Sequence, residues 1–146
     1  MRIMGLDVGD RRIGVALSDP GGVLASPLTT IQRTGGKRDV LAVLRLADAH
    51  EAETIVVGLP RMLSGDLGEQ ARKVIEFADK LRGQARVPIV LWDERYSTVT
   101  ADELMGQAGR RPAQRKARID EVAAAVILQS YLDHAPQQRD VSPGTA

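Results

Sequence analysis

Residues 1–18, MRIMGLDVGDRRIGVALS, give the clearest indication of the fold. Residues 2–8 form a short, mostly apolar run that meets the turn Gly9-Asp10, and a second such run follows over residues 12–18. Two short β-prone runs joined by a glycine-containing turn are typical of a β-hairpin. A third β-prone run covers residues 23–31, where Pro27 indicates a bulge or an edge position. We therefore expect three consecutive antiparallel strands at the start of the chain.

After residue 36 the pattern changes to apolar residues at helical spacing, interrupted by continuous apolar runs. Strand–helix–strand connections require parallel pairing, whereas the opening meander requires antiparallel pairing. The predicted fold is therefore α/β: a mixed five-stranded sheet, three antiparallel strands and then parallel strands, flanked by helices, which is the topology of the ribonuclease H-like fold. The polar, proline-containing end is expected to be a disordered tail. In residue numbers, we expect helices over 37–50, 67–83, 97–108 and 119–132, strands over 54–60 and 87–92, a break over 109–118, a domain over 1–135 and the tail over 136–146.

The composition narrows the chemistry that is available to the chain. Its 146 residues suffice for one ordinary domain, and they include no cysteine and only two histidines, His50 and His134. Disulfides and thiolate nucleophiles are excluded, and any metal is expected on oxygen ligands. The net charge of +1 gives no strong overall field, so nucleic-acid binding would depend on local patches. With neither a membrane-spanning window nor a signal peptide in the pattern, we expect a cytoplasmic protein with no membrane partner.

Three carboxylates from distant parts of the chain fall where they could meet. Asp7 lies at the end of an apolar strand, Glu94 follows the last predicted strand, and Asp120 lies in the first turn of the final predicted helix. The carboxyl ends of neighbouring parallel strands lie side by side, and a helix over them can point its first turn at the same place. Carboxylates so close repel one another unless a cation lies between them, and with oxygen ligands alone that cation would be Mg²⁺ or Mn²⁺. Two such ions can bind the attacking water and the leaving oxygen of a phosphodiester.

Each acid also has an ordinary interpretation. Asp7 could cap a strand-end turn, Glu94 could pair with Arg95, and Asp120 could complement a helix N-terminus. Only the set of three is informative. Arg95 and the adjacent acids Asp93 and Glu121 are expected to support the site without taking the leading role.

A basic segment precedes Asp120. Residues 110–118 contain five basic residues and no acidic one, which is usually a solvated loop. Next to an acidic metal site, however, such a segment could bind the phosphate backbone of a nucleic acid. With few aromatic residues to stack on bases, we expect recognition of phosphates and shape. The candidate nucleic-acid-binding residues are Arg11, Arg12, Arg110, Arg111, Arg115, Lys116 and Arg118.

Four ordered motifs resemble one family. They are GLDVG and RIGVA at residues 5–9 and 12–16, VGLP at 57–60, DER at 93–95 followed by Ser97 and Thr98, and Lys116 with Asp120, Ala123 and Ala124. Over about residues 1–133 the chain resembles the YqgF/RuvX family of bacterial ribonuclease H-like nucleases. The loop after VGLP departs from the family pattern, with Met62 and Ser64 where an asparagine and an aspartate are usual.

The resemblance implies a metal-dependent endonuclease with Asp7, Glu94 and Asp120 as catalytic acids. Its substrate would be structured nucleic acid, either precursor 16S rRNA in ribosome biogenesis or Holliday junctions in DNA recombination and repair. A junction resolvase would act as a homodimer, whereas an RNA-processing enzyme could act as a monomer.

Two other functions stay open. A non-catalytic nucleic-acid-binding domain could keep the same fold. The turn Asp7-Val8-Gly9 also resembles the phosphate-binding hairpin of actin- and hexokinase-type phosphotransferases, although those enzymes need two such domains.

Overall fold

The computed structural model describes residues 1–61, 67–94 and 112–141, and within the last range the side chains of residues 119–134. The strands form one sheet in the order β3-β2-β1-β4-β5. The pairs β1–β2 and β2–β3 are antiparallel, and the pairs β1–β4 and β4–β5 are parallel. This confirms the predicted mixed sheet, whose antiparallel and parallel halves meet at β1. The elements are β1 (Arg2–Val8), β2 (Arg12–Ser18), β3 (Ala25–Gln32), α1 (Gly36–Ala49), β4 (Ala52–Leu59), α2 (Glu69–Gln84), β5 (Ile89–Asp93) and α4 (Pro112–Val141).

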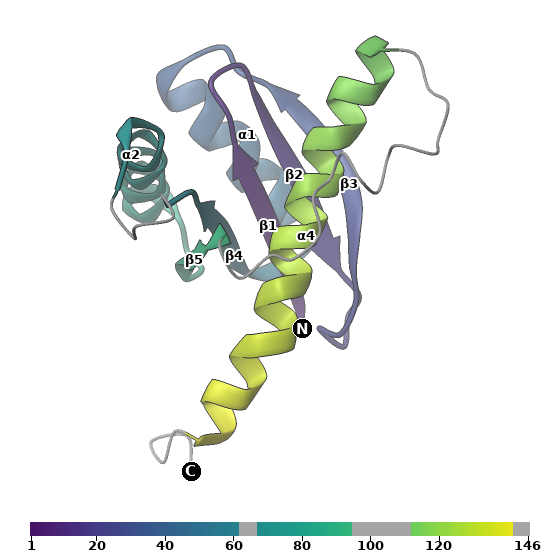
Figure 1. The fold of residues 1–146 in the computed structure, drawn as a ribbon. Coiled ribbons are helices and arrows are strands. Elements are labelled where there is room, and N and C mark those ends of the chain that lie inside the picture. Colours follow the sequence, from purple (N-terminus) through teal and green to yellow (C-terminus); the bar gives the residue numbers. More distant parts are fainter. Residues whose placement is uncertain (62–66, 95–111, 142–146) are drawn as a thin grey trace.

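The sheet is the middle of three layers (Figure 1), with α4 across one face and α1 and α2 on the other. Side chains of β1 alternate between these faces: Leu6 packs in the cluster that contains α1 and α2, and Ile3 packs in the cluster that contains α4. By the same alternation Asp7 faces α4. The position of Asp7 in the candidate site therefore follows from strand geometry alone.

Most of the predicted elements are confirmed. The helices expected over 37–50 and 67–83 are α1 and α2, and the strands expected over 54–60 and 87–92 are β4 and β5, each within two residues at either end. Pro27 lies in the edge strand β3 next to a register shift, as expected for a proline in a sheet. No described helix combines the length and apolar character needed to cross a membrane.

The last helix, α4, is longer at both ends than we expected. The predicted break is wrong from Pro112 onward, because proline suits a first helical turn and residues 113–118 are good helix formers without glycine. Asp120 therefore lies in the third turn of α4 and not in the first. The helix also continues through Pro136 to Val141, where we expected the tail, over residues that again contain no glycine. The helix expected over 97–108 and the end of the tail lie outside the described residues, and the domain boundary stays a prediction.

Two strand glycines let α4 lie close to the sheet. A Cβ added to Gly14 would lie 1.9 Å from the backbone oxygen of Asp120, and one added to Gly5 would lie 2.7 Å from the Cβ of Leu128. Neither distance is compatible with a side chain, so a substitution at either position would force the helix backbone to move. The absence of a side chain at Gly5 on β1 and at Gly14 on β2 therefore sets the distance of α4 from the sheet.

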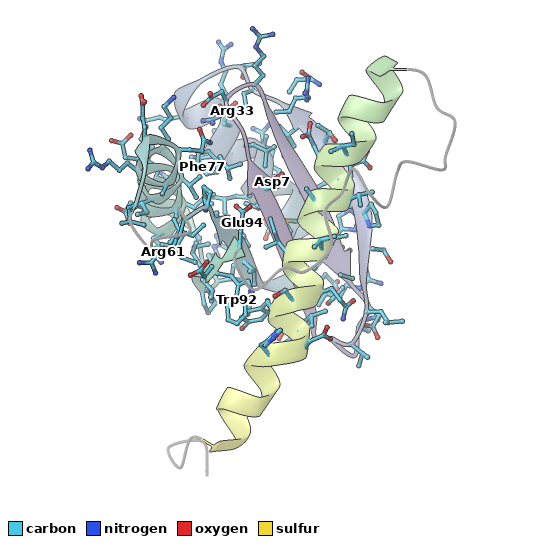
Figure 2. The ribbon with its side chains drawn as sticks, viewed as in Figure 1. Asp7, Arg33, Arg61, Phe77, Trp92 and Glu94 are labelled. Atoms are coloured by element: carbon cyan, nitrogen blue, oxygen red, sulfur yellow. The ribbon has the colours of Figure 1, made fainter. Side chains whose placement is uncertain are left out.

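A buried ion pair fixes the start of α1. The carboxylate of Asp39 is only 1% exposed and accepts hydrogen bonds from Arg33 Nε at 3.0 Å and from the backbone N–H of Thr34 at 2.8 Å and Gly35 at 3.2 Å. Burial alone would raise the pKa of Asp39, but these hydrogen bonds outweigh it and lower the pKa below its usual value. The Arg33 guanidinium also lies 5.1 Å from the ring centroid of Phe77 on α2 (Figure 2), which ties α2 to the same cluster.

Asp39→Asn is expected to lower the free energy of unfolding at neutral pH by about 2 kcal/mol, because it removes the charge that these donors stabilise. Since the pKa is lowered in the fold, this stabilisation is present above the ordinary pKa of an aspartate and is lost as the pH falls through the folded value. Urea unfolding should therefore show a difference between the two proteins that shrinks as the pH falls below the ordinary pKa of an aspartate. Asp79→Asn, which breaks an exposed pair with Arg82, is the control and should leave stability nearly unchanged. Equal losses in the two variants would contradict this account.

Candidate active site

Asp7 is the central carboxylate of the candidate site. It is the penultimate residue of β1 and pairs with Gly14 of β2, while its strand neighbours Leu6 and Val8 are buried in the core. Burial first, and the negative charge of Asp120 second, raise the pKa of Asp7 from 3.8 to about 6. A carboxylate in this position is costly to ionise unless a cation compensates it.

Glu94 approaches Asp7 from the end of β5. Its side chain lies against Gly58 of β4, where an added Cβ would come within 3.0 Å of Glu94 Oε2. Burial, followed by the charges of Asp7 and Asp93, raises the pKa of Glu94 from 4.5 to about 7. Figure 2 shows Asp7 and Glu94 in the same region, between α2 and α4. Two half-buried carboxylates that lie close together favour a proton or a cation between them.

Asp120 reaches the site from α4 but is held by Arg12. The Nε of Arg12 donates to Asp120 Oδ2 at 2.6 Å, and both side chains are half-buried. Among the described residues, no three His, Asp or Glu side chains gather closely enough to hold a metal ion. The structure therefore brings Asp7 near both of the other acids without gathering all three around one point.

The chemistry of the donors nevertheless fits a divalent cation. Asp7, Glu94 and Asp120 offer carboxylate oxygens, the ligands that Mg²⁺ and Mn²⁺ prefer, and the chain has no cysteine to select a softer metal. A cation at Asp7 and Glu94 would compensate the negative charges that burial first, and neighbouring carboxylates second, make costly to hold there.

Trp92 links β5 to α4 beside the site. Its Nε1 donates to Ser130 Oγ at 3.0 Å, and its ring meets that of Tyr131 edge-on at 5.4 Å. Because Trp92 is the single tryptophan of the chain and lies two residues before Glu94, its fluorescence reports on the contact between α4 and the site.

Arg61 is a basic residue of the site that the sequence analysis missed. It follows β4, and its Nη1 lies 3.7 Å from Asp93 Oδ2, so it brings positive charge to the strand ends beside Glu94. Its place directly after the VGLP motif is the signal that could have identified it.

Of the other predicted site residues, the structure describes some and leaves the rest undescribed. Arg11 is exposed in the β1–β2 turn, and Glu121 is half-buried on α4. Outside the description lie Arg95, Arg110, Arg111, the loop with Met62 and Ser64, and the side chains of Arg115, Lys116 and Arg118.

Comparisons with known proteins agree on one group of nucleases. The model of the RuvX family, described as Holliday junction resolvase, matches residues 1–134. A protein of Desulforudis audaxviator (strain MP104C) named "Putative pre-16S rRNA nuclease" is 44% identical over 140 residues, which cover 96% of this chain and 99% of that protein. A protein of the same name from Roseiflexus sp. (strain RS-1) is 50% identical over 132 residues, covering 90% and 94%.

A solved structure supports the fold. "T. thermophilus RuvC in complex with Holliday junction substrate" matches with a TM-score of 0.62 over 94% of this chain and 96% of that one. At 15% identity this likeness concerns the fold alone, and it confirms the ribonuclease H-like architecture expected from the order of strands and helices.

Proposed function

The chain belongs to the RuvX family of Holliday junction resolvases, and from that premise we propose that it is a metal-dependent endonuclease that processes precursor 16S rRNA. Membership of this family makes the protein a nuclease, a hydrolase of phosphodiester bonds. The observation that supports the metal dependence is the pair of half-buried carboxylates Asp7 and Glu94, whose pKa values are raised by burial and by neighbouring negative charge.

Two observations bear on the choice of substrate. The relatives that are 44% and 50% identical over nearly their whole lengths carry the name of a pre-16S rRNA nuclease, which favours RNA. The family description favours a second candidate, the resolution of four-way DNA junctions. Both substrates present closely spaced phosphates, which basic side chains bind whatever the base sequence.

In the proposed mechanism Asp7, Glu94 and Asp120 hold two divalent ions, Mg²⁺ or Mn²⁺. When bound, such ions lower the pKa of water and stabilise the charge that develops on the departing oxygen. Asp7 and Glu94 are set at the ends of β1 and β5, so the sheet fixes their separation, and α4 sets the position of Asp120. Asp93, Arg95 and Glu121 are adjacent to these acids in the sequence and are proposed to support them.

The basic residues of the proposed enzyme bind the substrate backbone around these acids. Arg11 in the β1–β2 turn and Arg61 after β4 contribute positive charge, and the segment 110–118 adds five more basic residues. Binding of this kind weakens as salt is raised, because counterions compete for the phosphates. We place this activity in the cytoplasm, where ribosomes are assembled, with a homodimer required only for paired cuts in a junction.

The proposal is tested by side-by-side cleavage of a labelled precursor 16S fragment and a labelled four-way junction with Mg²⁺ or Mn²⁺. We expect discrete cleavage of the RNA that stops with EDTA and in Glu94→Gln. The matched control Glu76→Gln, an exposed glutamate on α2, should cleave normally. Paired, symmetric cuts in the junction by a dimeric protein would instead establish the second candidate. Binding without cleavage, unaffected by metal or by Glu94→Gln, would identify a non-catalytic nucleic-acid-binding domain.

A further inference from the structure

The ion pair between Arg12 and Asp120 joins β2 to α4 at the edge of the site. Its atoms Nε and Oδ2 are 2.6 Å apart, with the Arg12 side chain 31% and the Asp120 side chain 24% exposed. A charge-assisted bond this short in a half-buried place is stronger than a surface pair, yet both groups stay within reach of an ion or a phosphate.

Strand geometry fixes Arg12 under this part of α4. Arg12 and Gly14 are two residues apart on β2 and therefore share a face, and the bare backbone at Gly14 supports the carbonyl of Asp120. Asp7, which pairs with Gly14 on the neighbouring strand β1, carries a charge of the same sign as Asp120. The Asp120 carboxylate is thus repelled by Asp7 and attracted by the Arg12 guanidinium.

We infer that Arg12 is a positioning residue that exchanges partners. In the metal-free protein it neutralises Asp120, and when a divalent ion takes that carboxylate the guanidinium is released to a phosphate of the substrate. This inference rests on the proposed function, because it requires Asp120 to be a metal ligand and the substrate to be a nucleic acid. The absence of a three-acid cluster among the described residues agrees with it, since Asp120 is engaged elsewhere.

The exchange has two measurable consequences. Arg12 competes with the ion for Asp120, so removing the guanidinium should tighten metal binding. The released guanidinium also couples metal binding to nucleic-acid binding, and thermodynamic linkage requires each ligand to strengthen the other by the same factor.

Metal binding is measured by calorimetry with Mn²⁺ and no nucleic acid. Arg12→Gln should bind Mn²⁺ about fivefold more tightly than the wild type, since the competing ion pair is gone. Arg11→Gln makes the same change of charge one residue away on the exposed turn and should change the affinity much less. Arg12→Lys, which keeps a cation, should fall between the wild type and Arg12→Gln. The inference is overturned if Arg12→Gln melts at a lower temperature but binds Mn²⁺ no more tightly than Arg11→Gln does. In that case the substitution has removed only a structural contact.

Coupling is measured by fluorescence anisotropy of a labelled four-way junction and a labelled precursor 16S fragment, each with and without Ca²⁺. Wild-type protein should bind about fivefold more tightly with the ion, and Arg12→Gln should lose most of that ratio. Arg11→Gln should bind more weakly in both conditions with the ratio unchanged. Equal ratios in the wild type and Arg12→Gln overturn the inference while leaving the proposed function intact. Failure of the wild type to bind Mn²⁺ at all overturns the proposed function and the exchange together.

Discussion

Asp7→Asn is expected to reduce cleavage by about a thousandfold and, in the metal-free protein, to raise the free energy of unfolding by about 2 kcal/mol. The loss of activity follows because an amide replaces a negatively charged ligand at the centre of the proposed site, where ion binding accounts for several kcal/mol of catalysis. The gain in stability follows because asparagine has nearly the same shape as aspartate but carries no charge. Burial of the charged Asp7 carboxylate is unfavourable, as its pKa of about 6 indicates.

The same variant changes how stability depends on pH. Asp7 and Glu94 have raised pKa values of about 6 and about 7, so these two groups hold more protons in the folded protein than in the unfolded chain between about pH 4 and pH 7. Their contribution to the stability of the metal-free protein therefore falls as the pH rises through that window, and Asp7→Asn should make the fall smaller. Thermal unfolding from pH 5 to pH 8, with chelator present, measures both effects.

A neighbouring carboxylate provides the control for Asp7. Asp10 is exposed in the β1–β2 turn, 3.5 Å from Lys73 Nζ, and Asp10→Asn should alter neither cleavage nor the pH profile. Added Mn²⁺ should raise the unfolding temperature of the wild type and of Asp10→Asn but not that of Asp7→Asn. An Asp7→Asn protein that is less stable than the wild type without metal would show that the carboxylate has a structural partner, and would contradict the assignment.

Gly14→Ala is expected to displace α4 and to lower the free energy of unfolding by about 3 kcal/mol or more. The new Cβ would lie 1.9 Å from the backbone oxygen of Asp120 and 2.3 Å from its carbonyl carbon, so the clash is with helix backbone and no side-chain rotation relieves it. As α4 moves, Asp120 moves away from Asp7, and cleavage should fall with the stability. The Trp92 fluorescence should shift because its hydrogen bond to Ser130 on α4 is disturbed.

Gly83→Ala is the matched control for Gly14→Ala. An added Cβ at Gly83 in α2 meets nothing within 4 Å, so alanine there should leave cleavage and Trp92 fluorescence unchanged and stabilise the helix slightly. Wild-type stability and fluorescence in Gly14→Ala would mean that α4 does not lie against β2 as the structure places it.

Much of the fold follows from local pattern. The pattern of apolar residues indicates which positions are buried. It predicts the hairpin of residues 1–18, the amphipathic helices α1 and α2 and the apolar strands β4 and β5, and the structure confirms them. The prediction of a break over residues 109–118 is wrong from Pro112 onward. A run of basic residues is typical of a loop, but these residue types are also good helix formers. The close approach of α4 to the sheet requires Gly5 and Gly14 inside apolar strands. The helix residues that pack against these glycines, Leu128 and Asp120, lie more than 100 residues away along the chain, so the sequence does not identify them.

For the candidate site, the chemistry that is available can be predicted from the residues alone: carboxylates without cysteine, basic residues near Asp120, and Asp7 and Glu94 at the ends of strands that parallel pairing brings together. The pairing of these charges, in contrast, depends on the packing of the elements. It places Arg12, expected as a phosphate contact, on Asp120, and it brings Arg61 to Asp93. The physical reason is that periodicity reports whether a residue is buried, a property of its own segment, whereas the partner of a charge depends on distances between segments that packing alone sets.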